Sequence, residues 1–164
     1  MDGLLRIGLP EAKWCEGDQI HLTLRFIGEV DGTTFKEIAN LLSEIKFHEF
    51  DLSLSGVGYF ASRGTVRVIW AGVKKCDELI FLQKRIANKL IHYGLEPEEK
   101  KFSPHITLAR TKDLQVFKIG PFIEYYNLYK SDQFKVNEFH LYSSKLTVKG
   151  SIYRKEYTYI SSPN

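Results

Sequence analysis

A tetrapeptide of the form His-x-Thr-Leu occurs twice, 84 residues apart, and this repeat constrains the fold more than any other feature of the chain. The copies occupy residues 21–24 and 105–108, and each lies in a run of apolar and β-branched residues that is typical of a strand. At the same offset, Phe50 matches Phe134. Around each copy the order strand, helix, hairpin recurs, which indicates an ancient duplication.

The remaining pattern predicts alternating strands and helices. We expect strands over residues 20–27 and 104–110, helices over 33–46, 76–93 and 121–129, and hairpins that join 50–54 to 65–70 and 133–141 to 151–160. Thr33 or Thr34 is expected to cap the first helix, and Gly94 to end the second. The predicted fold class is α+β, with two pseudo-symmetric lobes. Each lobe would hold one His-x-Thr strand, and the symmetry would place the two strands side by side at the junction, where concave sites tend to form.

The composition excludes several classes of protein. A chain of 164 residues, 43% of them apolar, suits one domain that needs no disulfide or metal to fold. No apolar run approaches the roughly 18–20 residues of a membrane span, and the first six residues lack the features of a signal peptide. Cys15 and Cys76 are too few for a disulfide framework and are not spaced as zinc ligands. We therefore expect a soluble, cytoplasmic protein.

The net charge of +3 is too small to indicate a protein that coats nucleic acid. Residues 1–83 carry −3 and residues 84–164 carry +6. The second half could supply a positive wall for an anionic ligand, and a solvated basic surface is the alternative. The charged loop over residues 96–101 leads into the second motif, where it is either solvated or a lid.

The two motifs suit acid–base chemistry at phosphorus. In a strand, residues two apart share a face, so His21 projects with Thr23, and His105 with Thr107. One imidazole can deprotonate an attacking water while the other protonates the departing oxygen, and the threonine hydroxyls can hold the non-bridging oxygens. This mechanism requires no metal or other cofactor. The alternatives are four exposed polar residues on half-buried strands, or a metal site, although neither motif has a second ligand at the usual spacing.

Six stretches carry a resemblance to a known family, and they cover residues 9–14, 20–30, 56–60, 68–73, 102–110 and 141–144. With the two motifs, they resemble the 2H phosphoesterase superfamily, and within it the RNA 2′,3′-cyclic phosphodiesterases, also called 2′-5′ RNA ligases. The resemblance implies a bilobed α+β fold, with an antiparallel sheet and outer helices in each lobe and the active-site groove between the lobes. It also implies metal-free opening of a 2′,3′-cyclic phosphate at an RNA end, giving a 2′-phosphate. It also implies reversible 2′-5′ ligation, with tRNA halves as candidate partners.

The resemblance assigns catalytic roles to the four motif residues. His21, Thr23, His105 and Thr107 match the family's catalytic positions one for one. We expect His105 to act as the base for water and His21 as the acid for the leaving oxygen. The reverse order is equally compatible with the symmetry of the motifs.

Four further residues are candidates for substrate binding. Arg110 matches an arginine that the family uses near its substrate, but strict alternation points it away from His105. Arg25 has the parity of the first motif, so alternation favours it as a phosphate contact. Tyr59 and Phe60, expected in a glycine-rich loop, could stack on a base, with a core role as the alternative for Phe60.

The family's first strand and helix would precede residue 9, so the resemblance implies that residues 1–164 form a single bilobed domain lacking both. We expect no membrane partner and a monomer, with a dimer through an open sheet edge as the alternative. Two other functions stay open. One is an RNA-end binding module with little turnover, and the other is a related phosphodiesterase acting on 2′,5′-oligonucleotides or small cyclic phosphates.

Overall fold

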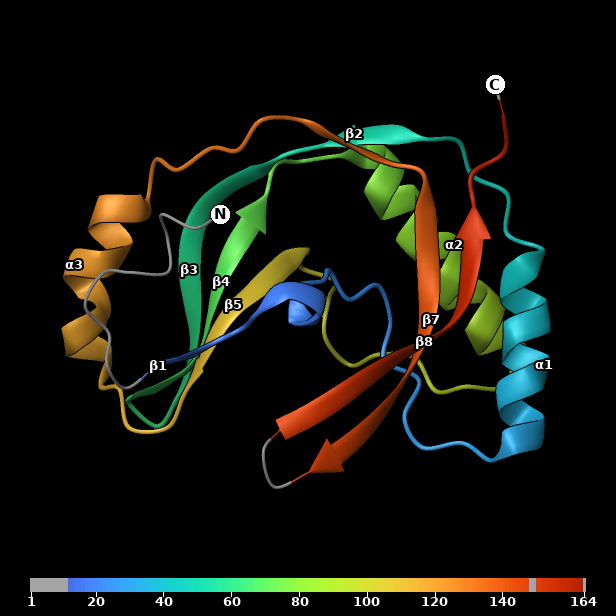
Figure 1. The fold of residues 1–164 in the computed structure, drawn as a ribbon, viewed down its shortest axis with the longest axis horizontal. Helices are drawn as coiled ribbons and strands as arrows, with labels where there is room; N and C mark the ends of the chain where they lie inside the picture. The colour runs from blue at the N-terminus through green and yellow to red at the C-terminus, as the bar shows by residue number, and fades with distance from the viewer. Residues whose placement is uncertain (1–11, 148–149, 164) are drawn as a thin grey trace. The chain divides into compact units, whose positions relative to one another are not determined.

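The structure is a computed structural model that describes residues 12–147 and 150–163. Its helices are α1 (Gly32–Ser43), α2 (Asp77–Tyr93) and α3 (Val116–Tyr126), with a short 3₁₀ turn, η2 (Gly17–Gln19) (Figure 1). Its strands are β1 (Ala12–Trp14), β2 (Phe50–Leu52), β3 (Leu54–Ser62), β4 (Thr65–Val73), β5 (His105–Thr111), β6 (Phe134–Val136), β7 (Glu138–Thr147) and β8 (Gly150–Ile160). All strand pairs are antiparallel, which confirms the predicted α+β class. None of the helices described is long and apolar enough to cross a bilayer.

The chain divides into two compact units that are interleaved along the sequence. Unit 1 comprises Met1–Thr23, Ser53–Lys75 and Ser103–Gln133, and unit 2 comprises Leu24–Leu52, Cys76–Phe102 and Phe134–Asn164. Both His-x-Thr segments belong to unit 1, so the prediction of one such strand in each lobe is wrong. The two segments meet inside this unit, through the isolated bridge between Leu22 and Ile106. The groove between lobes stays a prediction.

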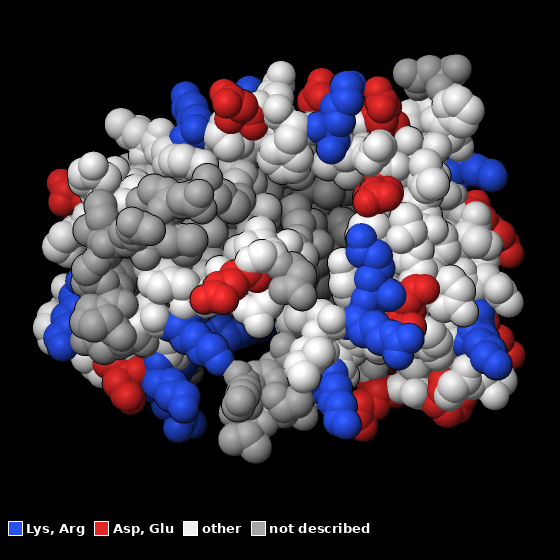
Figure 2. Space-filling view, viewed as in Figure 1, with Lys and Arg blue, Asp and Glu red and all other residues white. Residues whose placement is uncertain are grey.

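The division into units also changes the interpretation of the charge. Unit 1 contains 10 Lys and Arg residues against 7 Asp and Glu residues, a balance of +3. Unit 2 contains 13 of each kind and is neutral. Figure 2 shows basic and acidic side chains interspersed on the face in view. The charge difference between the units is therefore smaller than that between the sequence halves, and the excess positive charge lies in the unit that holds both motifs.

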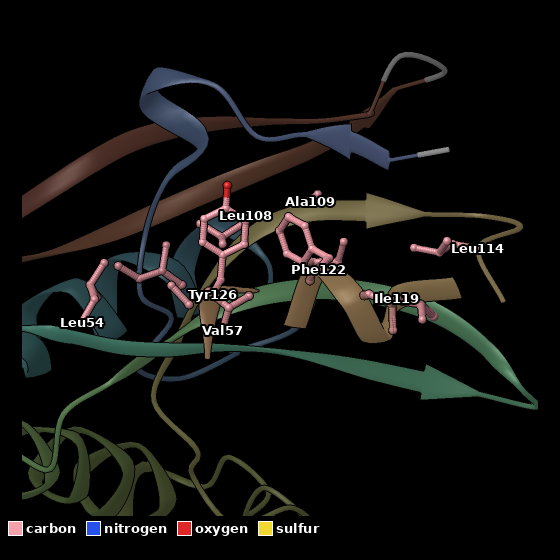
Figure 3. Packing of buried hydrophobic residues seen from close by; sticks show 12 residues of the cluster. Leu54, Val57, Leu108, Ala109, Leu114, Ile119, Phe122 and Tyr126 are labelled. Carbon is pink, nitrogen blue, oxygen red and sulfur yellow. The ribbon is translucent and has the colours of Figure 1, made fainter. Parts of the chain in front are cut away.

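Unit 1 is built on one four-stranded sheet in the order β1-β5-β4-β3. Apolar side chains of β3, β4 and β5 cover one face of the sheet, where α3 packs against them (Figure 3). From α3, Ile119, Phe122 and Tyr126 reach into this core, beside Val57 and Leu108. We call this side of the sheet the core face and the other side the open face.

Unit 2 holds the two longer helices, the β2–β6 pair and the β7–β8 hairpin. Phe139 and Tyr159 stack on adjacent hairpin strands, and Phe47 packs against Phe139. The Tyr159 hydroxyl donates a hydrogen bond to the carbonyl oxygen of Ala39 in α1, 3.0 Å away. This contact ties the hairpin to the helix.

Several local predictions are confirmed and several are corrected. The second helix and its end at Gly94, in the left-handed conformation with φ +114°, are confirmed. Helix α1 is capped by Asp31 instead of Thr33 or Thr34, because the Asp31 carboxylate accepts from both of their backbone N–H groups. These hydrogen bonds lower the pKa of the Asp31 carboxyl, with that from Thr34 contributing most.

The third helix begins at Val116, five residues before the expected start, so Pro121 lies inside it. The expected loop with Gly56 and Gly58 is part of the long strand β3, which turns into β4 at residues 63–64. Residues 20–27 do not form the predicted strand. Only Leu22 pairs, as an isolated bridge to Ile106.

Candidate active site

The Leu22–Ile106 bridge brings the two motifs side by side on the same edge of β5 that β1 occupies. The chain leaves β1, makes the η2 turn and returns to β5, so the first motif continues an interrupted edge strand. Leu22 and Ile106 pack on the core face. Their neighbours in each motif therefore project from the open face, as the alternation predicts.

The antiparallel register around this bridge arranges the four motif residues in a square. Extending the register by one residue each way sets His21 beside Thr107, and Thr23 beside His105. The histidines then occupy diagonal positions, which in a regular antiparallel pair lie about 7–8 Å apart. Both imidazoles therefore project from the same face.

Both imidazoles are anchored in the same way. Nδ1 of His21 lies 2.8 Å from the carbonyl oxygen of Gln19, and Nδ1 of His105 lies 2.7 Å from that of Ser103. A carbonyl oxygen can only accept, so Nδ1 carries the proton in both rings. In the neutral ring the basic nitrogen is then Nε2, and the orientation of each ring is fixed by a backbone group two residues upstream.

Two aromatic rings, those of Phe60 and Trp70, pack against His105 on the open face. Its imidazole meets the ring of Phe60 edge to face, with centroids 5.0 Å apart, and lies 6.2 Å from the indole of Trp70. The two aromatic rings are 5.5 Å from each other. A Cβ on Gly58 would collide with this indole, so Trp70 occupies the space that the missing side chain leaves over β3. Trp70 is a site residue that sequence reasoning missed.

A second glycine, in β4, also allows close packing beside these rings. Gly72 pairs with His105, and a Cβ there would lie 2.5 Å from the carbonyl oxygen of Ser55. Gly58 in the stretch 56–60 and Gly72 in the stretch 68–73 therefore have a packing reason. They are the signal by which the bulky Trp70 between them could have been found.

A β-bulge in β5 determines from which face of the sheet Arg110 projects. Trp70 pairs with Thr107, but Ile69 pairs with Ala109, so β5 holds one extra residue at that point. Leu108 and Ala109 are consequently both buried, and the alternation is inverted beyond them. Arg110 therefore projects from the open face with His105 and Thr107, although strict parity predicts the opposite.

Two predicted substrate contacts lie elsewhere. Tyr59 pairs with Ile69 and packs against the core cluster, so it points away from the open face that carries Phe60 and His105. The expected loop is wrong, because Tyr59 lies in β3, and its packing against the core does not fit the predicted stacking on a base. Phe60 remains available, since 41% of it is exposed.

The guanidinium of Arg25 contacts two other residues of unit 2. Its guanidinium donates to the carbonyl oxygen of Glu96 and lies 3.4 Å from a carboxylate oxygen of Glu98. Only 6% of the Arg25 side chain is exposed. These contacts hold the loop before the second motif to the segment after the first. They do not fit the predicted direct phosphate contact, since both terminal nitrogens of the Arg25 guanidinium already have partners.

Two cationic side chains and one thiol also gather on the open face. Lys13 pairs with Arg110 across β1 and β5. Cys15 comes directly after β1, and its backbone N–H donates to the carbonyl oxygen of Leu108. Burial raises the pKa of the Cys15 thiol, while Arg110 and Lys13 act in the opposite direction. Within residues 12–147 and 150–163, no three His, Cys, Asp or Glu side chains lie where they could together hold a metal ion.

Comparison with known proteins identifies the class. The model of the 2′-5′ RNA ligase superfamily matches residues 10–147, and the chain belongs to this superfamily. Its relatives include proteins named RNA 2′,3′-cyclic phosphodiesterase. That of Thermotoga maritima is 38% identical over 148 residues, covering 89% of this chain and 78% of the relative. That of Archaeoglobus fulgidus is 35% identical over 147 residues, covering 90% of this chain and 82% of the relative.

Solved structures share the fold. E. coli LigT complexed with 3′-AMP superposes with a TM-score of 0.77 at 25% identity, covering 95% of this chain and 85% of that one. The protein TT0787 of Thermus thermophilus gives a TM-score of 0.76 at 25% identity, covering 92% and 82%. The family resemblance inferred from the sequence is thereby confirmed.

Proposed function

We propose that the chain is a metal-independent hydrolase that opens 2′,3′-cyclic phosphates at RNA ends, acting in the cytoplasm as one 2H phosphoesterase domain over residues 1–164. The observation that carries this proposal is the matched pair of anchored imidazoles, His21 and His105, with a threonine beside each. The names of the relatives, RNA 2′,3′-cyclic phosphodiesterase, support the same reaction.

The proposed reaction is an in-line displacement at phosphorus. His105 starts neutral, and its Nε2 takes a proton from a water whose oxygen bonds to the phosphorus. The bond from phosphorus to O3′ breaks on the opposite side, and His21, which starts as imidazolium, gives its Nε2 proton to O3′. The product carries a 2′-phosphate, and the two histidines have exchanged protonation states, which solvent restores. Each proton transfer typically contributes 10²- to 10⁴-fold to the rate.

The threonines and Arg110 balance the charge on the phosphate. In the proposed complex, the hydroxyls of Thr23 and Thr107 donate to the non-bridging oxygens, where negative charge grows in the transition state. β-Branched side chains hold these hydroxyls in few rotamers, so little ordering is needed during the reaction. Arg110 faces the same side through the bulge and would contact the phosphate from along β5.

The same site would carry out ligation when a hydroxyl replaces water. A 5′-hydroxyl of a second RNA strand, such as a tRNA half, would attack the phosphorus and release O3′, leaving a 2′-5′ linkage. The reverse step exchanges the roles of His21 and His105, because the base of one direction is the acid of the other.

The test is a cleavage assay with chelator present, on 2′,3′-cyclic mononucleotides, short RNAs with cyclic ends and 2′,5′-linked oligonucleotides. We expect a 2′-phosphate product from the cyclic ends. His21→Ala and His105→Ala should each lose at least about 10²-fold in kcat. His48→Ala, an exposed histidine of unit 2, is the matched control and should retain full activity.

Full activity in either motif variant would refute the two-histidine mechanism. Loss of activity with chelator would refute metal independence. Binding of cyclic ends without any product would favour the RNA-end binding module, and cleavage confined to 2′,5′-linked substrates would favour the related phosphodiesterase.

A further inference from the structure

Each motif lies beside a point where the chain passes from one unit to the other. Thr23 ends the first segment of unit 1, and the chain continues in unit 2 from Leu24. It returns after Phe102, so Ser103, whose carbonyl oxygen anchors His105, is the first residue of the last unit 1 segment. The geometry of the motifs therefore depends on how these two connections are held.

Regular secondary structure does little to hold the two connections. Residues 24–28 and 95–98 belong to no helix or strand. In unit 1, the first motif meets β5 through the isolated Leu22–Ile106 bridge and not through a continuous ladder. One bridged pair does not by itself fix the residues on either side of it, so side-chain contacts are needed to keep the motifs in register.

Arg25 supplies such contacts within unit 2. One terminal nitrogen of its guanidinium donates to the carbonyl oxygen of Glu96, and the other lies 3.4 Å from Oε2 of Glu98. The second carboxylate oxygen of Glu98, Oε1, accepts from the backbone N–H of Phe26, 3.4 Å away. The segment that follows the first motif is thus joined to the segment that leads into the second.

The guanidinium of Arg25 is shielded from water. Only 6% of its side chain is exposed, against 32% for that of Glu98, and its Nε is buried with no acceptor among the described residues. Opposite charges attract each other more strongly where water is excluded, and removing one of them leaves the other uncompensated. The contact is therefore firmer than an exposed ion pair, whose partners separate readily.

We propose that Arg25 is a positioning residue for the reaction, which keeps His105 beside Thr23 by joining the two connections. This inference rests on the proposed function, because it concerns the same motif residues. The path is short on both sides, since Thr23 lies two positions before Arg25, and Ser103 lies five positions after Glu98. A shift of about 1 Å in a reacting group can cost about 10²-fold in rate.

The first test is the variant Arg25→Met, which keeps much of the apolar stem and removes the guanidinium. On a 2′,3′-cyclic mononucleotide we expect kcat to fall about tenfold to a hundredfold, with KM changed less than about twofold. Arg25→Lys restores the charge without the planar fork that reaches two partners, so it should recover part of the loss.

Arg85→Met is the matched control. Arg85, in α2, also donates from its guanidinium to a backbone carbonyl oxygen of unit 2, that of Lys46. Neither residue borders a motif, so this variant should keep the wild-type kcat.

A second measurement separates positioning from folding. Urea unfolding at the assay temperature gives the folded fraction of each variant, and kcat is expressed per folded molecule. In a His105→Ala background, Arg25→Met should lower the remaining kcat less than about twofold, because an absent imidazole cannot be displaced. A general loss of structure would instead lower kcat by the same factor in both backgrounds.

Glu98→Gln is a milder second variant, and it decides the question if Arg25→Met gives no cooperative unfolding. Its amide oxygen still accepts from the N–H of Phe26, while the charge that faces Arg25 is lost. We expect kcat to fall about threefold to tenfold, again with KM nearly unchanged.

The outcomes separate this inference from the proposed function. If the wild-type chain cleaves no cyclic end, the proposed function fails. If the wild-type chain cleaves it but folded Arg25→Met and Glu98→Gln keep the wild-type kcat, the positioning role is refuted. An equal loss in the His105→Ala background would refute it too. So would a raised KM with unchanged kcat, since that result would place Arg25 in contact with the substrate.

Discussion

Each histidine, the carbonyl that anchors it and the threonine beside it lie within five consecutive residues. A backbone carbonyl two positions upstream fixes the imidazole through Nδ1, and a threonine two positions downstream stands on the same face. Because every part lies within one short segment, the sequence was sufficient to predict which four residues come together. It could not reveal the anchoring carbonyls of Gln19 and Ser103, since these depend on backbone conformation and not on residue type.

The threonines offer a direct test of charge stabilisation at this scale. Thr23→Val and Thr107→Val keep the shape of the side chain and remove the hydroxyl, so each should lower kcat about 10²- to 10³-fold. Thr23→Ser and Thr107→Ser should retain most of the activity because the donor remains. Steady-state kinetics on a cyclic mononucleotide measures both effects. A valine variant with wild-type kcat would show that the hydroxyls do not contact the reacting phosphate.

Gly58 carries a second prediction, since Trp70 lies where its side chain would be. Gly58→Ala should displace the indole from beneath His105, destabilise the protein by about 1–3 kcal/mol and reduce kcat. Gly120→Ala in α3 is the matched control, because nothing lies within 4 Å of a Cβ there. It should stabilise the helix by about 0.5–1 kcal/mol and leave kcat unchanged. Urea unfolding measures the stability of both variants, and steady-state kinetics measures their kcat. Equal stability and equal kcat in the two variants would contradict the packing argument.

At the scale of elements, the sequence predicted those whose signals are local. The apolar spacing and Gly94 placed α2 correctly, and the period of two placed β5. The bulge opposite Ile69 and Trp70 could not be predicted, because it depends on how two strands distant in sequence are paired. The glycines of β3 predict a loop because glycine usually marks a turn, whereas Gly58 accommodates a side chain from the next strand.

The contact between the β7–β8 hairpin and α1 predicts an alkaline limit to stability. Burial raises the pKa of Tyr159 to about 12, and Tyr157 adds to the shift. The neutral phenol is the form that the folded state favours. Its contribution is therefore complete below the unfolded pKa of about 10 and is lost as the pH rises through about 12.

The expected result is a falling free energy of unfolding between pH 10 and 12, measured by urea titration. Tyr159→Phe should cost about 1 kcal/mol at pH 7 and should show a smaller loss over that interval, because it has no proton to release. Tyr125→Phe, at an exposed position of α3, should remain within about 0.5 kcal/mol of wild type. A Tyr159→Phe profile parallel to that of the wild type would contradict the assignment.

At the scale of the whole molecule, the duplication seen in the sequence does not correspond to a division of the chain at its middle. The chain passes between the two units five times, and each unit takes three separate segments. The central strand β5 of the unit 1 sheet comes from the second half of the sequence, whereas its neighbours β1 and β4 come from the first. The two copies of the repeated motif therefore lie in the same unit, where the Leu22–Ile106 bridge joins the first to the edge of β5.

This interleaving predicts that neither half of the sequence folds alone. A fragment of residues 1–83 contains β1, β3 and β4 but lacks β5, so the sheet has no strand between β1 and β4. It also lacks β6, the partner of β2. The fragment of residues 84–164 retains the β7–β8 hairpin but loses α1, on which Tyr159 depends. Each fragment should show no cooperative thermal transition by circular dichroism, whereas an equimolar mixture should regain one. A cooperative transition in either isolated fragment would mean that the sequence halves are autonomous lobes after all, as the duplicated pattern first indicated.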